Sequence, residues 1–312
     1  MFLGLAIGDA LGMPLEFKER GTFAEIETMQ AGGAFNLPVG YWTDDTSMAL
    51  CLADSILENR GYDSYDVMDR YAKWRNEGYR SSTGACFDIG NQTTTAISEY
   101  LRHPQVSVET QRGESAGNGS IMRLTPVVMA SLAARNSLEQ TMALGAASAR
   151  ETHYSIVAET ATAIFAAMLA KAVDANTKQD VLDFSTANYA QSDPIVAVIK
   201  GAASKTPDVL KPTGYVIDTL EVAMWAFMTT DTFKEGALKT VNMGGDADTI
   251  GAVYGQLAGA YYGCQGIPSE WLEVLHDSAD LRQLASSLSS VDHFSILRTR
   301  FDEDIQGSNM LG

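Results

Sequence analysis

The sequence is poor in cysteine and in basic residues. Its three cysteines, Cys51, Cys86 and Cys264, are far apart and form no Cys-x-x-Cys pair, which is typical of reduced thiols in a cytoplasm. Lys and Arg together number 22 against 39 Asp and Glu, so the formal net charge is -17, and the basic residues form no run. These features predict a cytoplasmic protein and argue against nucleic acid as a partner.

Long apolar runs and targeting segments are also missing. The N-terminal stretch "MFLGLAIGDALG" has no basic start and reaches Asp9 early, unlike a signal peptide. The most apolar stretch, residues 156–173, carries Glu159 and Lys171, so it falls short of the roughly 18 apolar residues that a membrane span requires. We therefore expect no signal peptide and no membrane partner.

Strand patterns, in which polar and apolar residues alternate, are almost absent, whereas alanine-rich segments with helical apolar spacing recur. A hydrophobic content of 46% suffices for a large core, and no long Pro/Gly/Ser linker divides the chain. The sequence predicts an all-α protein with a single domain over residues 1–305 and a frayed tail at 306–312. Helices are expected at residues 47–57, 120–134, 141–149, 156–173, 215–228, 250–262 and 271–288. Polar loops are expected at residues 18–41, 103–118, 174–178 and 187–194.

Glycines recur at a spacing of four in two apolar segments. They are Gly4, Gly8 and Gly12 near the N-terminus, and Gly251, Gly255, Gly259 and Gly263 further along. Glycine in a helix interior costs roughly 1 kcal/mol relative to alanine, so such a row is expected where another backbone approaches closely. We expect both segments to be helices in the crowded centre of the bundle, packed against each other; the simpler alternative is that glycines accumulate in alanine-rich helices.

Two acidic turns stand in front of apolar segments: "YWTDDTSM" at residues 41–48 and "VNMGGDADTI" at residues 241–250. Each turn alone is a plausible helix start, in which Asp or Thr caps the first turn and the helix dipole favours an anion. If folding brings the two turns together, four carboxylates crowd one site and repel one another. Two divalent cations would remove that repulsion, and an all-oxygen ligand set favours Mg²⁺ or Mn²⁺ over Zn²⁺.

The second turn also resembles the Asp-x-Asp nucleophile motif of haloacid-dehalogenase-type phosphatases. That motif follows an apolar strand near the start of an α/β domain. Here Asp246 and Asp248 follow Met-Gly-Gly in a helical region, which disfavours a phosphatase of this type.

Six segments, taken together and in this order, resemble the ADP-ribosylglycohydrolase family. They are "GLAIGDALGMPLEF" (residues 4–17), "GYWTDDTSMAL" (40–50), "STGACFDIGN" (82–91), "GNGSIMRLTP" (117–126), "THYS" (152–155) and "VNMGGDADTIGA" (241–252). The resemblance implies a compact all-α fold with a binuclear Mg²⁺ or Mn²⁺ centre that cleaves ADP-ribose from a modified side chain.

The resemblance also implies roles for individual residues. The metal ligands would be Thr43, Asp44, Asp45, Asp246, Asp248 and Thr249. The residues that contact ADP-ribose would be Asn91, Gly117, Asn118, Gly119, Ser120 and His153. Asp88 matches a carboxylate near the reacting ribose, and Glu16 matches a glutamate associated with gating and catalysis.

The diphosphate of ADP-ribose needs local positive potential on a surface of this charge. Backbone N–H groups of the "GNGS" turn at residues 117–120 are expected to supply it, although the same turn also suits a plain helix start capped by Ser120. His153 by itself is more typical of a structural hydrogen-bond donor than of a ligand. Trp42, Trp74, Tyr79 and Phe87 lie near these motifs and either stack on substrate or fill the core.

Several alternatives remain open from the sequence. Asp88 either moves a proton or orients a metal-bound water. The expected partner is an ADP-ribosylated protein or an ADP-ribose derivative, with arginine favoured as the acceptor over serine or O-acetyl-ADP-ribose. A non-catalytic ADP-ribose-binding or crystallin-like protein is the rival, and the oligomeric state is not predicted.

Overall fold

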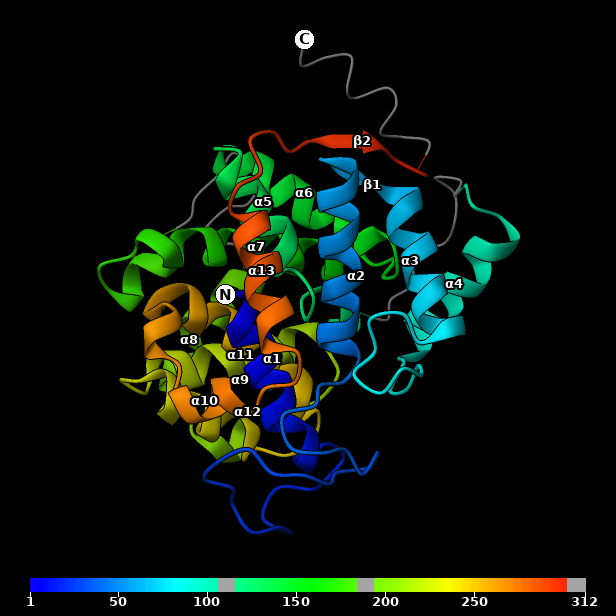
Figure 1. Ribbon diagram of the computed structural model, residues 1–312. Coiled ribbons are helices and arrows are strands. Elements are labelled where there is room, and N and C mark those ends of the chain that lie inside the picture. The colour runs from blue at the N-terminus through cyan, green and yellow to red at the C-terminus, as the bar shows by residue number, and fades with distance from the viewer. Residues whose placement is uncertain (106–115, 184–193, 302–312) are drawn as a thin grey trace.

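The computed structural model describes residues 1–105, 116–183 and 194–301, and helices dominate it, as predicted (Figure 1). The α-helices are α1 (Phe2–Gly12), α2 (Asp44–Asn59), α3 (Ser64–Glu77), α4 (Asn91–Arg102), α5 (Thr125–Ala133), α6 (Leu138–Arg150), α7 (Ile156–Asp174), α8 (Pro194–Gly201), α9 (Val216–Met228), α10 (Phe233–Val241), α11 (Ala247–Tyr262), α12 (Ser269–Val274) and α13 (Ser278–Leu288). Short 3₁₀ turns include η1 (Met13–Leu15), η2 (Asn118–Ser120) and η3 (Lys178–Leu182). Strands β1 (Tyr62–Asp63) and β2 (Ile296–Arg298) form a small parallel pair.

The two glycine-bearing helices pack against each other, as their spacing predicted. A Cβ built on Gly4 would lie 2.1 Å from the carbonyl oxygen of Gly255, and one on Gly8 would lie 1.9 Å from that of Gly251. These distances leave no room for any side chain, so α1 and α11 run antiparallel with their backbones in contact. The arrangement places the end of α1 beside the start of α11, where the second acidic turn lies.

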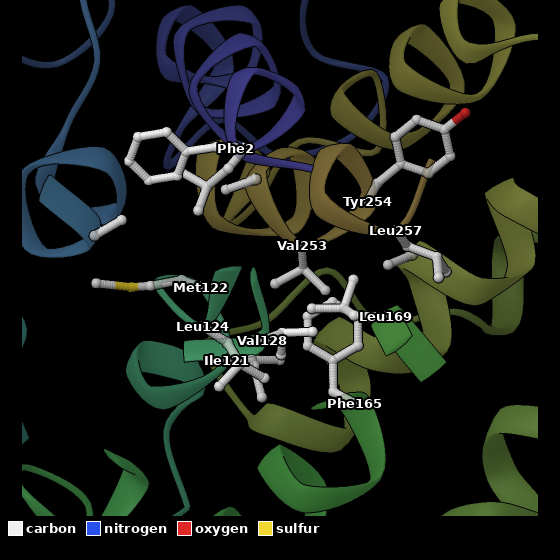
Figure 2. Close-up of a cluster of buried hydrophobic side chains, with 14 of the residues drawn as sticks. Phe2, Ile121, Met122, Leu124, Val128, Phe165, Leu169, Val253, Tyr254 and Leu257 are labelled. Atoms are coloured by element: carbon white, nitrogen blue, oxygen red, sulfur yellow. The ribbon is translucent and has the colours of Figure 1, made fainter. Parts of the chain in front are cut away.

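Buried apolar side chains from nearly all the helices surround this pair in one connected core. In the part of it shown in Figure 2, Phe165 and Leu169 of α7 lie near Val253 and Leu257 of α11. Of the helices in the described ranges, α7 alone has the length and hydropathy to cross a membrane, and 61% of that apolar window is buried inside the protein. It therefore serves here as a core helix.

Two predicted helix boundaries are wrong for identifiable reasons, and one glycine of the predicted row lies outside its helix. The helix expected at 120–134 begins only at Thr125, because residues 118–120 form a 3₁₀ turn and Pro126 suits the first turn of a helix. The helix expected at 271–288 is two helices, since His276 donates its N–H to Gly40 and stacks on Tyr41 at 4.1 Å. Gly263 does not continue the glycine row; it follows the end of α11 with φ of 71°.

The other expectations have mixed outcomes. Residues 18–41 contain no helix or strand, as expected, and helices α3, α4, α8 and α10 were not predicted. The loops expected at 103–118 and 187–194 fall largely outside the described residues, and so does the tail at 306–312. The single-domain boundary at residue 305 therefore stays a prediction.

Candidate active site

The two acidic turns meet. Helix α2 begins at Asp44 and α11 begins at Ala247, and the N-termini of both helices converge on the end of α1. The hydroxyl oxygen of Thr43 lies 3.1 Å from Asp45 Oδ2 and 3.1 Å from Asp248 Oδ2. Thr249 Oγ1 lies 3.5 Å from Asp45 Oδ2. Residues separated by about two-thirds of the chain thus form one oxygen-rich cluster, which is the condition under which the sequence favours a cation site.

Simple helix capping does not explain these turns. Thr43 is the N-cap of α2 and Asp246 is the N-cap of α11, yet neither side chain accepts a capping hydrogen bond from a backbone N–H of its helix. Instead, Thr43 points at carboxylates of other elements. The side chains are therefore directed into a common site, at the expense of the local caps that they would otherwise make.

Asp9 is a site residue that the sequence analysis missed. Its carboxylate is fully buried in α1 and accepts four hydrogen bonds from the first acidic turn. Oδ1 accepts from the N–H and hydroxyl of Thr43 at 2.8 and 3.0 Å, and Oδ2 accepts from those of Thr46 at 3.0 and 2.6 Å. Asp9 thus fixes the turn that carries Asp44 and Asp45. A lone carboxylate between two glycines of an apolar helix was the available signal.

The Gly-Gly pair before Asp246 has a structural reason. Gly244 and Gly245 have φ of 68° and 66°, the left-handed region that favours glycine. This conformation lets Gly245 exchange backbone hydrogen bonds with the segment after α1: its N–H donates to Lys18 at 2.8 Å, and its carbonyl accepts from Phe17 at 2.7 Å. The second acidic turn is thereby attached to Glu16 and its neighbours.

A cavity of about 680 Å³ opens beside the cluster. The predicted residues that line it are Glu16, Asp44, Asp88, Asn91, Gly117, Asn118, Gly119, His153, Asp246, Asp248 and Thr249. Thr43 and Asp45 do not line it and are fully buried behind it. Ser120 does not line it either, and its hydroxyl accepts a hydrogen bond from Thr162 at 2.8 Å. Phe17, Gln92 and Gly214 line the cavity without having been predicted.

The glycine turn at residues 117–120 does not offer all of its N–H groups to a ligand. The N–H of Gly117 donates to Gln92 Oε1 at 2.9 Å, and that of Asn118 donates to the carbonyl of Gly214 at 3.0 Å. The Asn118 side chain donates to Asp246 Oδ2 at 2.6 Å. The turn is thus tied to the acidic cluster, and the expectation of a row of exposed N–H donors was wrong for two of the four residues.

The buried side chain of Arg123 supplies positive charge next to the glycine turn at residues 117–120. Arg123, which is 1% exposed, donates to the carbonyl of Gly119 and to Thr152 Oγ1, each at 2.6 Å. Thr152 Oγ1 lies 2.8 Å from His153 Nδ1. Thr152 Oγ1 accepts from Arg123, and among the described residues His153 Nδ1 is the one acceptor placed for the buried Thr152 hydroxyl proton, which leaves the proton of the neutral ring on Nε2. Burial and the Arg123 charge lower the pKa of His153 to about 3.

The ring of His153 faces the glycine turn. A Cβ on Gly119 would lie 2.7 Å from His153 Cε1, and one on Gly117 would lie 3.2 Å from Nε2. Both positions therefore need glycine for the ring to reach the cavity. His153 presents an uncharged N–H donor there, supported by a buried guanidinium.

The acidic cluster is electrostatically incomplete. The single hydroxyl proton of Thr43 can serve only one of the carboxylate oxygens around it, and Asp45 Oδ1 and Asp248 Oδ1 are buried with no hydrogen-bond partner among the described residues. Burial, followed by neighbouring carboxylates, raises the pKa of Asp44, Asp45 and Asp248 well above the usual range. Carboxylate oxygens of Asp9, Asp45 and Asp248 lie within 4.8 Å of one another, which suits a hard divalent cation.

Glu16, Asp88 and Asp248 form a second group with carboxylate oxygens within 4.8 Å of one another. Burial and the charge of Asp88 raise the pKa of Glu16 to about 10, whereas burial raises that of Asp88 to about 7. Asp88 has φ of 60°, an uncommon conformation for a residue other than glycine. Two neighbouring carboxyl groups with separated pKa values are typical of an acid and base pair.

The chain was compared with protein-family models, with known protein sequences and with solved structures, and all three comparisons find ADP-ribosylglycohydrolases. A family model described as ADP-ribosylglycohydrolase matches residues 1–295. The chain is 37% identical over 289 residues to ADP-ribosylarginine hydrolase Tri1 of Serratia proteamaculans (strain 568), covering 92% of this chain and 77% of that protein. It is 33% identical over 279 residues to ADP-ribosyl-(dinitrogen reductase) glycohydrolase of Rhodospirillum rubrum, covering 88% of each. A solved structure titled ADP-ribosylglycohydrolase-related protein complex matches with a TM-score of 0.76 and 38% identity, covering 94% of this chain and 96% of that one.

The helical bundle, its carboxylate-rich cavity and these relatives define an enzyme of the hydrolase class. The chain belongs to the ADP-ribosylglycohydrolase family. The family resemblance carried by the six sequence motifs is thereby confirmed.

Proposed function

We propose that this protein hydrolyses the N-glycosidic bond between ADP-ribose and an arginine side chain of a modified protein. The observation that carries the proposal is the convergence of the α2 and α11 N-termini on a cavity that also holds Glu16, Asp88 and His153. Relatives named for ADP-ribosylarginine and ADP-ribosyl-(dinitrogen reductase) substrates support this choice of substrate class.

The predicted metal ligands fit two divalent cations, Mg²⁺ or Mn²⁺. Thr43, Asp44, Asp45, Asp246, Asp248 and Thr249 would hold them. The buried oxygens Asp45 Oδ1 and Asp248 Oδ1, which lack partners, support this assignment, as does the absence of His and Cys from the cluster. When bound, the cations would supply Lewis-acid charge that holds the ribose hydroxyls in place beside the breaking bond.

The glycine turn and His153 are suited to the diphosphate. Among the described residues that line the cavity there is no lysine or arginine, so an anion depends on other donors. His153 offers Nε2–H, and the buried guanidinium of Arg123 raises the local potential behind Gly119. This neutral donor does not titrate near neutral pH, because the pKa of His153 is about 3. Binding of the diphosphate should then stay constant between pH 6 and pH 8 as far as His153 is concerned.

Glu16 acts as the general acid and Asp88 as the general base of the hydrolysis. Glu16, with the higher pKa, holds the proton and donates it to the departing guanidine nitrogen as the bond from the anomeric carbon breaks. Asp88, with the lower pKa, accepts a proton from the water that attacks the anomeric carbon. The products are ADP-ribose and a free arginine side chain, and the proton from water replaces the one that Glu16 has lost.

Matched peptides test the choice of acceptor. Two peptides that differ only in carrying ADP-ribose on arginine or on serine are incubated with the enzyme and Mn²⁺, and free ADP-ribose is measured. Faster release from the arginine peptide is expected, because a strongly basic leaving group benefits from the acidic cavity wall. Faster release from the serine peptide would show that the O-linked substrate is the physiological class.

A cytoplasmic location and an ADP-ribosylated protein partner belong to the same proposal. Cys51, Cys86 and Cys264 are all free thiols, which agrees with a reducing compartment.

A further inference from the structure

Three phenylalanines form a chain of ring contacts that starts at the cavity, and Phe17 is the one that lines it. The rings of Phe17 and Phe35 lie edge to face with centroids 6.4 Å apart, and those of Phe35 and Phe87 are tilted with centroids 5.1 Å apart. Each of the outer two is adjacent in sequence to a carboxylate of the site: Phe17 follows Glu16, and Phe87 precedes Asp88. The cluster joins the segment after α1, the long loop before α2 and the segment before α4.

Core packing does not account for Phe17. Its side chain is 67% exposed, the largest value among the exposed large hydrophobic residues of the described chain, although it lines the cavity. Its φ of 62° is an outlier for a bulky residue, and such a conformation persists only where the surroundings enforce it. They do: Phe17 donates its N–H to Gly245 at 2.7 Å, and Gly245 donates to Lys18 at 2.8 Å. These hydrogen bonds hold Phe17 in its left-handed backbone conformation, and in that conformation its ring is exposed to solvent.

The polar group beside this ring is also unsatisfied. Glu16 is only 4% exposed, and its Oε2 has no hydrogen-bond partner among the described residues, yet Glu16 lines the cavity. An aromatic face next to buried acceptor oxygens matches a planar cation with several N–H donors. A guanidinium meets both needs, because it is weakly hydrated, stacks on aromatic rings and donates to a carboxyl oxygen such as Glu16 Oε2, which accepts whether or not the carboxyl group carries a proton on its other oxygen. A serine hydroxyl gains little from such a face.

We propose that Phe17, Phe35 and Phe87 form the subsite for the modified arginine, with the guanidinium stacked on Phe17 and in contact with Glu16. This assignment rests on the proposed hydrolysis of ADP-ribosyl-arginine and adds the residues that select it over other linkages. The subsite binds the acceptor side chain, whereas ADP-ribose occupies the deeper part of the cavity.

The test compares two substitutions of Phe17 that retain its bulk. Phe17→Leu removes the aromatic face, and Phe17→Tyr keeps it. For Phe17→Leu we expect KM for an ADP-ribosyl-arginine peptide to rise about three- to thirty-fold, the range for loss of a partly desolvated cation–π contact, with kcat changed less than KM. Phe17→Tyr should lie close to wild type. The control is Leu101→Ala, which shortens an exposed apolar residue of α4 outside the cavity.

Calorimetry with free ADP-ribose locates the effect. The Kd of ADP-ribose should be the same for wild type and Phe17→Leu. If Phe17→Leu instead loses affinity for ADP-ribose as much as for the peptide, the ring contacts the ADP-ribose moiety and the proposal is overturned. Wild-type KM for Phe17→Leu would also overturn it. If Phe17→Leu lowers the thermal midpoint, Phe35→Leu provides the same comparison from the second ring.

Failure of the proposed function gives a different result. A wild-type enzyme that releases ADP-ribose from the serine peptide and not from the arginine peptide contradicts the function and the subsite together. A wild-type enzyme that prefers the arginine peptide, with that preference unchanged in Phe17→Leu and Phe35→Leu, contradicts the subsite alone.

Discussion

Thr43 and Asp248, which stand at the starts of two helices far apart in the chain, lie in hydrogen-bond contact, with 3.1 Å between the Thr43 hydroxyl oxygen and Asp248 Oδ2. The same hydroxyl oxygen lies 3.0 Å from Asp9 Oδ1 and 3.1 Å from Asp45 Oδ2. One proton cannot satisfy three carboxylates, so the folded chain needs further positive charge at this point. The cluster could therefore hold a divalent cation, and it forms where α1 and α11 meet.

Asp9 should position the first acidic turn. Asp9→Asn places an amide where Thr46 requires an acceptor, so we expect the free energy of unfolding to fall by about 1–3 kcal/mol and Mn²⁺ to bind more weakly. Thr46→Val, which removes one donor and keeps the shape, should cost less in both measurements. Urea unfolding and Mn²⁺ titration of the two variants test this, and an Asp9→Asn protein equal to wild type in both would refute the role.

Asp88 should act in the chemical step. Asp88→Asn keeps the size of the side chain but cannot take a proton, so kcat should fall about 10²-fold or more while ADP-ribose still binds. Single-turnover kinetics and calorimetry separate the two quantities. Loss of ADP-ribose binding together with activity would instead assign Asp88 a binding or scaffolding role.

The stability of the metal-free protein should fall as pH rises from about 6.5 to 8. Glu16, with a pKa of about 10, and Asp88, with a pKa of about 7, hold protons in the folded state that the unfolded chain releases above about pH 4, and burial raises the pKa of Asp44, Asp45 and Asp248 in the same direction. Each such group lowers the free energy of unfolding by about 1.4 kcal/mol per pH unit until it ionises in the folded state.

Two basic groups with lowered pKa values oppose this fall in stability with rising pH, to a smaller extent. The buried amino terminus, with a pKa lowered to about 6, opposes it by a single proton, and His153 does so only below its unfolded pKa of about 6.5. Urea unfolding in chelator at several pH values checks the sign, and Mn²⁺ should stabilise more at pH 8 than at pH 6.5. Stability that rises over this range in chelator would contradict the burial of mutually repelling carboxyl groups.

The contact between α1 and α11 should tolerate no side chain. Gly8→Ala would put a Cβ 1.9 Å from the Gly251 carbonyl oxygen, so the helices must separate, with a cost of about 1–3 kcal/mol or more in the free energy of unfolding. Because α1 and α11 carry Asp9 and Asp248, Mn²⁺ affinity should fall as well. In the matched control, Gly201→Ala, the added Cβ meets no atom within 4 Å, and stability should change by less than about 1 kcal/mol. Equal stability of both variants would refute the argument.

The sequence predicted those parts of the fold that depend on local patterns. The glycine spacing predicted the contact between α1 and α11, and apolar periodicity located α7 and α9 to within about one residue. Helices α3 and α4 were missed because they are polar and poor in alanine, and tertiary packing stabilises them instead. The break between α12 and α13 arises from His276 bonding to Gly40, a contact that no local pattern encodes.

The site was predictable where residues stand in a conspicuous turn and not where they act from elsewhere. Asp44 and Asp248 lie in short acidic turns in front of apolar segments, a pattern that is visible in the sequence. Asp9 and Arg123 are single charges within apolar segments, and their roles appear only once the chain folds around them. The exposure of Phe17 is likewise a property of the folded chain, because its N–H donates to Gly245, a residue far away in the sequence.

The most direct test of the central claim is the initial rate of ADP-ribose release from an ADP-ribosyl-arginine peptide by chelator-treated enzyme, before and after Mn²⁺ is restored. Asp248→Ala and the control Asp174→Ala, an exposed acid at the end of α7, are measured beside wild type. We predict no release by wild type in excess chelator, full recovery with Mn²⁺ for wild type and Asp174→Ala, and no recovery for Asp248→Ala. Undiminished release by wild type in excess chelator, or by Asp248→Ala, would contradict the account.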